Sequence, residues 1–199
     1  MKRRVIVASG NQGKIEEIRE ILAELDLEVV SMKDAGVELD VEETGSSFEE
    51  NAMLKARGIA QLTDDLVIAD DSGLEIDYLN REPGIYSARY LGRDVSYDIK
   101  NQNLLDRMEG VPDEKRTARF VCAVAAVLPN KKELVVRGIM EGMIGYEIKG
   151  EHGFGYDPIF FLPEYGMTSA EILPEEKNRI SHRGKALQKM FELLKKEKI

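Results

Sequence analysis

The sequence contains a single cysteine, no apolar run long enough to cross a bilayer, and no excess of basic residues. Cys122 cannot form an internal disulfide, which favours a reducing, cytoplasmic environment. The apolar stretch 120–128 is far shorter than the roughly 20 residues of a transmembrane helix. The N-terminal apolar run is too short for a secretion signal. The formal net charge of −9 argues against extended contact with nucleic-acid phosphates.

The chain is long enough for a sizeable core, and its composition is that of a globular protein. It has 199 residues, of which 43% are hydrophobic. We find no repeat, no low-complexity segment and no linker long enough to separate two domains. We therefore expect one domain over residues 1–199, with neither nucleic acid nor membrane as a partner.

Hydrophobic periodicity predicts alternating strands and helices in the first half of the chain. One stripe of a helix after the first strand contains Ile15, Ile18, Leu22 and Leu25. The stretch Ser47–Glu50 has the capping-box spacing. Strands are expected at 5–8, 27–31, 66–69, 118–128, 134–144 and 159–162, and helices at 14–25, 48–62, 95–109 and from 181 onward. This order predicts an α/β fold with a mixed β-sheet flanked by helices.

The first motif is SGNQGK, which leads from a strand into a helix. Gly10 and Gly13 permit a tight turn, and Lys14 stands beside it. Backbone amides and the positive end of the helix dipole would meet there, an arrangement typical of phosphate binding. The spacing is not that of a Walker motif. A plain strand-to-helix turn has the same features, so this stretch alone leaves both interpretations open.

Two adjacent aspartates, Asp70 and Asp71, follow the apolar run LVIA. We expect them at the carboxyl end of a buried strand, where ligands collect in open α/β sheets, before a turn at Ser72 and Gly73. Neighbouring carboxylates repel unless a cation compensates, and Mg²⁺ suits carboxylate oxygens and phosphates. Because successive strand residues point oppositely, one aspartate would ligate the metal while the other orients or deprotonates water. The alternative is that one aspartate caps a turn.

An acidic loop precedes the second predicted helix. It contains Glu42 and Glu43, and either could complete the carboxylate cluster. Asn51 and Lys55 are four residues apart and therefore share one face of that helix. Read alone, the stretch is also typical of a solvated loop followed by a surface helix.

The stretch GFGYDPIFF places an aromatic residue between two glycines. Gly153 and Gly155 free the backbone to present the ring of Phe154, which could stack on a base at roughly 1–3 kcal/mol. Asp157 follows and could hydrogen-bond the edge of that base. The alternative is an aromatic residue packed into the core at a turn.

Basic residues gather near the start of the last predicted helix, which Ser181 caps. They are Lys177, His182 and Arg183. The helix dipole disfavours cations at this end. We therefore expect these groups to face something negative or rich in acceptors.

Seven stretches occur in order between residues 9 and 187: SGNQGK, EETG, SFEENAMLKA, IADDSGLEID, PGIYSARY, GFGYDPIF and ISHRGKAL. Together they resemble the inosine triphosphate pyrophosphatases, also described as dITP/XTP diphosphatases. The resemblance implies Mg²⁺-dependent hydrolysis of ITP, dITP and XTP to the monophosphate and pyrophosphate, which removes damaged nucleotides from the precursor pool. It also implies a homodimer of an elongated mixed sheet with two lobes around a central nucleotide-binding cleft.

The resemblance also assigns roles by position. Asp71 would accept the proton of the attacking water. Glu42, Glu43, Asp70 and Asp71 would hold Mg²⁺, and of the two glutamates we favour Glu42 as the one that touches the metal. The substrate would contact Ser9, Gly10, Asn11, Gln12, Gly13, Lys14, Lys55, Ser72, Phe154, Gly155, Tyr156, Asp157, Lys177, His182 and Arg183.

Two other functions are compatible with these motifs. One is a nucleotide-binding regulator that does not hydrolyse its ligand. Such a protein could bind Mg²⁺ but would not need a further base in the carboxylate cluster. The other is a pyrophosphatase for modified pyrimidine nucleotides built on a similar scaffold.

Overall fold

A computed structural model describes residues 3–24, 27–37 and 39–197. The α-helices are α1 (Gln12–Ile21), α2 (Phe48–Ala60), α3 (Tyr97–Arg107), α4 (Pro174–Ile180) and α5 (His182–Lys196). The strands are β1 (Arg3–Val7), β2 (Leu27–Ser31), β3 (Leu66–Ile76), β4 (Glu82–Pro83), β5 (Thr117–Val127), β6 (Glu133–Ile144), β7 (Phe160–Leu162) and β8 (Met167–Thr168). Short 3₁₀ helices cover Leu22–Glu24, Asp77–Leu79, Gly84–Arg89, Asp113–Lys115 and Asp157–Ile159.

The strands form a mixed sheet, as predicted. Their order is β2-β1-β3-β5-β6-β7-β8, and β4 pairs with β3. β1 pairs in parallel with β2 and β3, whereas the β3–β4, β6–β7 and β7–β8 pairs are antiparallel. No helix in the described part of the chain is both long and apolar enough to cross a membrane.

The chain forms two compact units. The first comprises Met1–Asp71, Cys122–Gly138 and His182–Ile199, and the second comprises Ser72–Val121 and Ile139–Ser181. β3, β5 and β6 each supply residues to both units, because each of these strands spans one of the boundaries. The units are described separately below.

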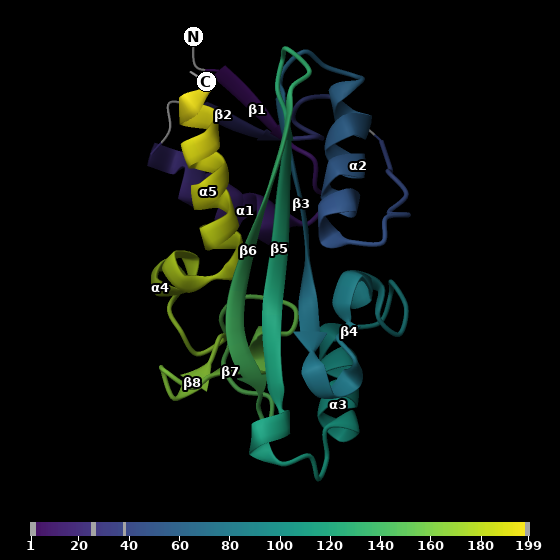
Figure 1. Cartoon of the computed structure of the whole chain (residues 1–199), viewed down its shortest axis with the longest axis vertical. Helices are drawn as coiled ribbons and strands as arrows, with labels where there is room; N and C mark the ends of the chain where they lie inside the picture. Colours follow the sequence, from purple (N-terminus) through teal and green to yellow (C-terminus); the bar gives the residue numbers. More distant parts are fainter. Residues whose placement is uncertain (1–2, 25–26, 38, 198–199) are drawn as a thin grey trace. The chain divides into compact units, whose positions relative to one another are not determined.

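In the first unit, helices lie on both sides of the strands. Figure 1 shows α1 and α5 on one side and α2 on the other. One core cluster joins alternate residues of β1 and β3 to the apolar stripes of α1 and α5: Val5, Val7, Leu66, Ile68, Ile15, Ile18, Leu187 and Met190. The apolar residues predicted for α2 are also buried, namely Ala52, Ala56, Ile59 and Ala60. Leu25, expected to extend the stripe of α1, lies outside the described residues.

The second unit has its own core. It is formed by the distal part of β3, by α3 and by β7, and includes Leu74, Ile76, Leu104 and Phe160. Arg116 is buried beside it and donates to the carbonyl oxygens of four residues, Met108, Val111, Ile144 and Gly145. This guanidinium therefore ties the end of α3 to the end of β6.

Most element predictions are confirmed, but α4, the two-residue strands β4 and β8 and the short 3₁₀ helices were not predicted. Ser47 caps α2 by accepting the Glu50 amide at 3.1 Å. The Glu50 carboxylate bonds Ser46 rather than Ser47, so the capping box is displaced by one residue. α4 was not predicted, because its seven residues PEEKNRI carry no apolar stripe.

Candidate functional site

The apolar run before the two aspartates predicts a strand that ends at Ala69, and this prediction is wrong. β3 continues unbroken through Ser72 and Gly73 to Ile76. Its pairing with β1 stops at Ile68, β5 is its other neighbour in the sheet, and β4 pairs with it at Glu75 and Ile76. The aspartates therefore lie inside a strand, just beyond the carboxyl end of the parallel β1–β3 pair.

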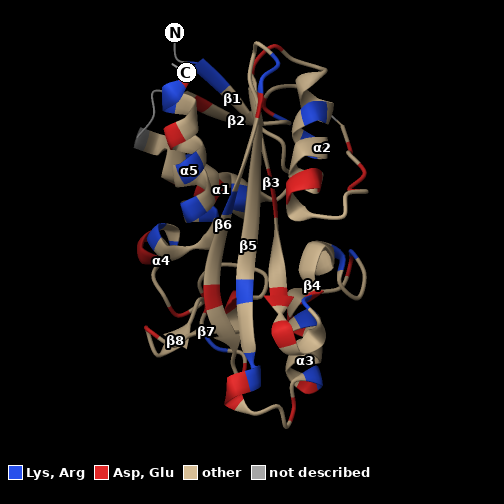
Figure 2. Ribbon diagram, in the orientation of Figure 1, with Lys and Arg blue, Asp and Glu red and all other residues tan. Residues whose placement is uncertain are grey.

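Strand alternation places the two aspartates on opposite faces of the sheet. Asp70 has the same parity as Leu66 and Ile68, which pack against α1 and α5. Asp71 contacts a residue of α2 instead. Figure 2 shows acidic colouring within β3 and both acidic and basic residues on the helices α2 and α5 of the same unit. The two carboxylates thus have different partners, and the predicted division of their roles stays a prediction.

Asp70 is enclosed by cations. Its carboxylate lies 3.0 Å from Lys14 Nζ of α1 and 3.4 Å from Arg183 Nε of α5, and its side chain is fully buried. Burial alone would raise the pKa of Asp70, but Lys14, Arg183 and Lys55 outweigh it, so the pKa is well below the usual value. Arg183 also forms an ion pair with Glu17 of α1. Asp70 is therefore a permanent anion at neutral pH.

The pKa of Asp71 is shifted in the opposite direction from that of Asp70. Burial raises its pKa more than Lys55 and Lys14 lower it. Asp71 Oδ1 lies 3.4 Å from Lys55 Nζ, which also bonds Glu43 at 2.7 Å. Among the residues that the structure describes, Asp71 Oδ2 has no hydrogen-bond partner although it is buried. Asp71 is thus a carboxylate with a raised affinity for protons and an oxygen available to a ligand.

The structure brings Glu43, rather than Glu42, to this cluster. Glu42 is exposed, and Glu43 bonds Lys55. Within the described ranges, no three Asp, Glu, His or Cys side chains are close enough to form a complete metal site. The four-carboxylate Mg²⁺ site expected from the sequence therefore stays a prediction.

The SGNQGK stretch forms a capped helix start. Asn11 is the N-cap of α1, and its side chain accepts the amide of Lys14 at 3.2 Å. Ser9 Oγ accepts the amide of Asn11 at 3.1 Å. A Cβ built on Gly10 would meet nothing within 4 Å, so the chain has open space at this position. The predicted turn is present, and Lys14 joins it to Asp70.

A second polar cluster lies in the second unit. Asp157 Oδ2 accepts from Lys177 Nζ at 2.7 Å and from the Phe154 amide at 2.9 Å. Lys177 Nζ lies 5.3 Å from the centre of the half-buried Phe154 ring. Ser169, which sequence reasoning missed, donates to Asp157 Oδ1 at 2.9 Å. No spacing in the sequence indicates Ser169, because it reaches Asp157 only through the pairing of β7 and β8.

The other predicted residues of this loop have different surroundings. Tyr156 lies in the core, where its hydroxyl donates to the Ser87 carbonyl at 2.7 Å, and burial raises its pKa. Gly155 is held by α3, since Asn101 Nδ2 donates to its carbonyl at 3.0 Å. The side chain of Tyr156 therefore contributes packing, whereas the backbone around it presents Phe154.

We expected the basic residues to gather at the start of one helix, and this expectation is wrong for Lys177, His182 and Arg183. Lys177 lies in α4 and the second unit, whereas His182 and Arg183 begin α5 in the first unit. The expectation failed because α4, which was not predicted, contains Lys177 and ends before α5 begins. Two of these residues face negative groups: Lys177 pairs with Asp157, and Arg183 pairs with Glu17 and Asp70. Their common contact with a base stays a prediction.

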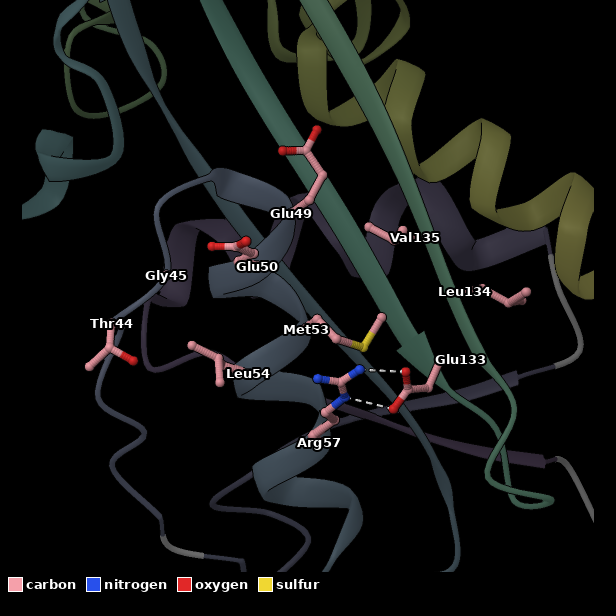
Figure 3. Close-up of a pocket in the computed structure, with 10 residues that line it drawn as sticks. All are labelled: Thr44, Gly45, Glu49, Glu50, Met53, Leu54, Arg57, Glu133, Leu134 and Val135. Carbon is pink, nitrogen blue, oxygen red and sulfur yellow. Dashed lines mark hydrogen bonds and ion pairs between the residues drawn. The ribbon is translucent and has the colours of Figure 1, made fainter.

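A hollow of about 610 Å³ lies beside α2 in the first unit. Figure 3 shows it between α2 and the start of β6, where Arg57 bonds Glu133. The residues that line it include none of the predicted catalytic, substrate or metal contacts, but Thr44 and Gly45 of its lining directly follow Glu43 in the loop. The hollow is therefore next to the carboxylate cluster without being lined by it.

The fold and these clusters define a mixed α/β protein with a lysine-paired carboxylate centre beside a parallel strand pair. The chain belongs to the Ham1 family, whose model matches residues 5–193. It is 46% identical over 97% of its length to a dITP/XTP pyrophosphatase of Clostridium perfringens, of which it covers 98%. It is 45% identical to one of Bacillus subtilis, covering 96% of this chain and 97% of the relative. A solved Staphylococcus aureus Ham1 structure matches with a TM-score of 0.87 and 42% identity, over 98% of this chain and all of that one.

Proposed function

We propose that the protein hydrolyses ITP, dITP and XTP to the nucleoside monophosphate and pyrophosphate, and so removes damaged purine nucleotides from the precursor pool. The observation that carries the proposal is Asp71. It is buried, its pKa is raised, and one of its oxygens has no hydrogen-bond partner among the described residues. Relatives at 45–46% identity are named dITP/XTP pyrophosphatase.

In the proposed mechanism, Asp71 takes a proton from the water that attacks the α-phosphorus. A carboxylate with a raised pKa is a better base at neutral pH than an ordinary one. The triphosphate is held by the Ser9–Lys14 stretch and by Lys55. The pKa of Lys55 is raised, since Asp71, Asp70 and Glu43 together outweigh its burial. Lys55 therefore stays cationic and stabilises the charge that develops on the leaving pyrophosphate.

The residues of the carboxylate cluster fit Mg²⁺. Asp71 and Glu43 are oxygen donors that share one lysine, and Asp71 Oδ2 has no partner among the described residues. Mg²⁺ usually takes one or two carboxylates and completes its shell with water and substrate phosphates. When bound, the ion would supply charge neutralisation and a polarised water. Asp71 and Glu43 would hold it, with Asp70 and Glu42 as the further predicted ligands.

Base recognition is assigned to the cluster around Asp157. The ring of Phe154 supplies a stacking face, and Lys177 is a cationic donor beside it. Hypoxanthine and xanthine carry an acceptor oxygen at position 6, whereas adenine carries a donor amine there. An adenine amine facing such donors leaves polar groups unpaired, which gives strong discrimination. His182 and Arg183 are predicted as further donors.

The assembly and location follow from the family resemblance. We infer that the protein is a homodimer and that it is located in the cytoplasm. A single cysteine that is buried and free is consistent with the cytoplasmic location. Light scattering after size-exclusion chromatography should give twice the chain's 22.4 kDa. A monomer across the working concentration range would contradict this part of the proposal.

The test is pyrophosphate release from ITP, XTP, dITP, GTP, ATP and dUTP, with and without Mg²⁺. Asp71→Asn should lower kcat for ITP by about 10²–10⁴-fold, the usual range for a general base, while nucleotide binding is retained. The control is Asp64→Asn, because Asp64 is a fully exposed carboxylate of the same unit. Binding without turnover in the wild type would favour a regulator. Preference for dUTP would favour a pyrimidine enzyme, and equal kcat/KM for ATP and ITP would exclude the proposed specificity.

A further inference from the structure

Asn51 of α2 is a buried amide with no role in the mechanism above. Its side chain is completely inaccessible to solvent. Oδ1 accepts the Gly45 amide at 2.8 Å, and Nδ2 has no hydrogen-bond partner among the described residues. A buried donor without an acceptor costs roughly 1–3 kcal/mol. An apolar residue would avoid that cost but could not accept the Gly45 amide. We therefore attribute the presence of an asparagine here to its hydrogen bond with the loop.

The loop before α2 is attached to that helix at three successive points. Glu43 bonds Lys55, the Gly45 amide bonds Asn51, and Ser46 bonds the Glu50 carboxylate at 2.7 Å through its amide. Figure 3 shows Gly45 in the loop beside the first turn of α2, where Glu50 is labelled. Asn51 is the middle attachment, and among the three helix residues that make these bonds it is the fully buried one. It therefore fixes the backbone between the two outer contacts.

The fit between Gly45 and α2 leaves no room for a side chain. A Cβ on Gly45 would lie 2.7 Å from Asn51 Oδ1 and 2.7 Å from Glu50 Cβ. The backbone therefore reaches Asn51 only because this position is glycine. Two residues earlier, Glu43 turns its carboxylate to Lys55, which lies one helical turn beyond Asn51.

We propose that Asn51 is a positioning residue for the Mg²⁺ centre: by clamping the Gly45 backbone it holds the Glu43 carboxylate beside Lys55 and Asp71. The inference rests on the proposed function, because it takes Glu43 and Asp71 as ligands of the ion. Groups that orient metal ligands commonly change metal affinity by about 10–100-fold when they are removed.

The experiment measures Mg²⁺ binding directly. Isothermal titration calorimetry follows Mg²⁺ binding to the protein saturated with an ITP analogue whose α–β bridge is an imido group. Asn51→Leu should weaken Mg²⁺ binding by about 10-fold or more and raise the Mg²⁺ requirement for turnover to match. The KM for ITP at saturating Mg²⁺ should be unchanged. Asn51→Asp keeps the acceptor for the Gly45 amide and should retain more affinity than Asn51→Leu.

The matched control is Asn101→Leu. Asn101 is likewise a helical asparagine that is buried and bonds a loop backbone, but it lies in the second unit and holds Gly155. The Asn101→Leu substitution should leave Mg²⁺ binding unchanged. Gly45→Ala pushes the same loop away from Asn51 and should reproduce the Mg²⁺ defect, which keeps the proposal testable if Asn51→Leu does not fold.

Two results would overturn the proposal, and they can be told apart. If Glu43→Gln weakens Mg²⁺ binding while folded Asn51→Leu and Gly45→Ala bind it normally, the role of Asn51 is wrong and the metal assignment stands. If Glu43→Gln also binds Mg²⁺ normally, Glu43 is not a ligand. The positioning role then falls together with that part of the proposed function.

Discussion

At the residue scale, Asp70 and Asp71 are neighbours in the chain with opposite pKa shifts. Strand alternation gives them different surroundings, and the balance between burial and cations then differs. Asp70 has two cations within 3.4 Å, so its pKa is lowered despite complete burial. Asp71 shares its nearest cation, Lys55, with Glu43, and burial outweighs the attraction of Lys55 and Lys14, so its pKa is raised. One carboxylate is fixed as an anion, and the other is suited to accept a proton.

Asp70→Asn should destabilise the fold by roughly 3 kcal/mol at neutral pH, because Lys14 and Arg183 lose a buried counter-charge. A carboxylate whose pKa is lowered by folding stabilises the native state above its unfolded pKa. That stabilisation is lost as the pH falls through the lower, folded value. The difference between variant and wild type should therefore shrink as the pH falls below the ordinary value of 3.8. Urea unfolding in EDTA, followed by far-UV circular dichroism, measures it.

A constant difference at all pH values would contradict this argument, since it would mean that the charge of Asp70 does not matter. Asp34→Asn is a suitable control, because Asp34 is an exposed carboxylate of the same unit, where its partners are Ser31 and Arg19. That substitution should change the free energy of unfolding little at any pH.

At the scale of elements, the start of α5 is positioned by its close contact with β6. A Cβ on Gly138 would collide with the carbonyl oxygen of His182 and would lie 2.6 Å from the amide of Ala186. Lys189 of α5 also donates to the Arg137 carbonyl at 2.7 Å. The helix that carries Arg183 to Asp70 therefore depends on a glycine in the facing strand.

Gly138→Ala should displace the first turn of α5 and lower stability by roughly 1–3 kcal/mol, the usual range for overpacking. Because Arg183 moves with that turn, nucleotide affinity should fall as well. Gly145→Ala is the matched control just after the other end of β6, where a Cβ would have its nearest contact at 3.5 Å, an ordinary distance. Thermal unfolding and titration with a non-hydrolysable ITP analogue measure both effects. Equal behaviour of the two variants would contradict the role given to Gly138.

At the scale of the whole molecule, the chain passes between its two units four times. Three of these passages lie inside β3, β5 and β6, and the fourth lies between α4 and α5. Residues on either side of the first three passages therefore belong to one continuous strand. We expect the units to unfold together, because unfolding of either unit removes pairing from strands that continue into the other.

The composition provides a separate probe for each unit. All seven tyrosines lie in the second unit, and there is no tryptophan, so intrinsic fluorescence reports on that unit alone. Cys122 lies in the first unit, and burial raises its pKa to about 12, so its thiol should react only after unfolding. Tyrosine fluorescence and thiol labelling should give the same urea midpoint.

Arg116→Met tests this coupling from within the second unit. The substitution removes a buried guanidinium that donates to four carbonyl groups, and we expect a loss of roughly 2–4 kcal/mol. Both midpoints should fall by the same amount. If only the fluorescence midpoint falls while Cys122 stays protected, the units unfold independently.

Local sequence signals were sufficient for much of the fold, whereas the site residues that they indicate stay predictions. Helical stripes and apolar runs predicted α1, α2, α3 and α5 and the main strands, because the burial of one face imposes a period of 3.6 or 2 on the sequence. The same alternation predicted different roles for Asp70 and Asp71. The ordered motifs were sufficient to identify the family, which the match over residues 5–193 confirms.

The tertiary structure alone decided which partners these residues have. β3 continues past Asp71 because neighbouring strands keep pairing with it, and no local signal contains that information. Asp70 meets Arg183 across 113 positions of sequence, and Ser169 reaches Asp157 through a strand pair. The sequence shows which residues are ionisable, but the pKa values of these residues depend on burial and on cations supplied by distant elements. For that reason only the fold could distinguish the fixed anion Asp70 from the proton acceptor proposed at Asp71.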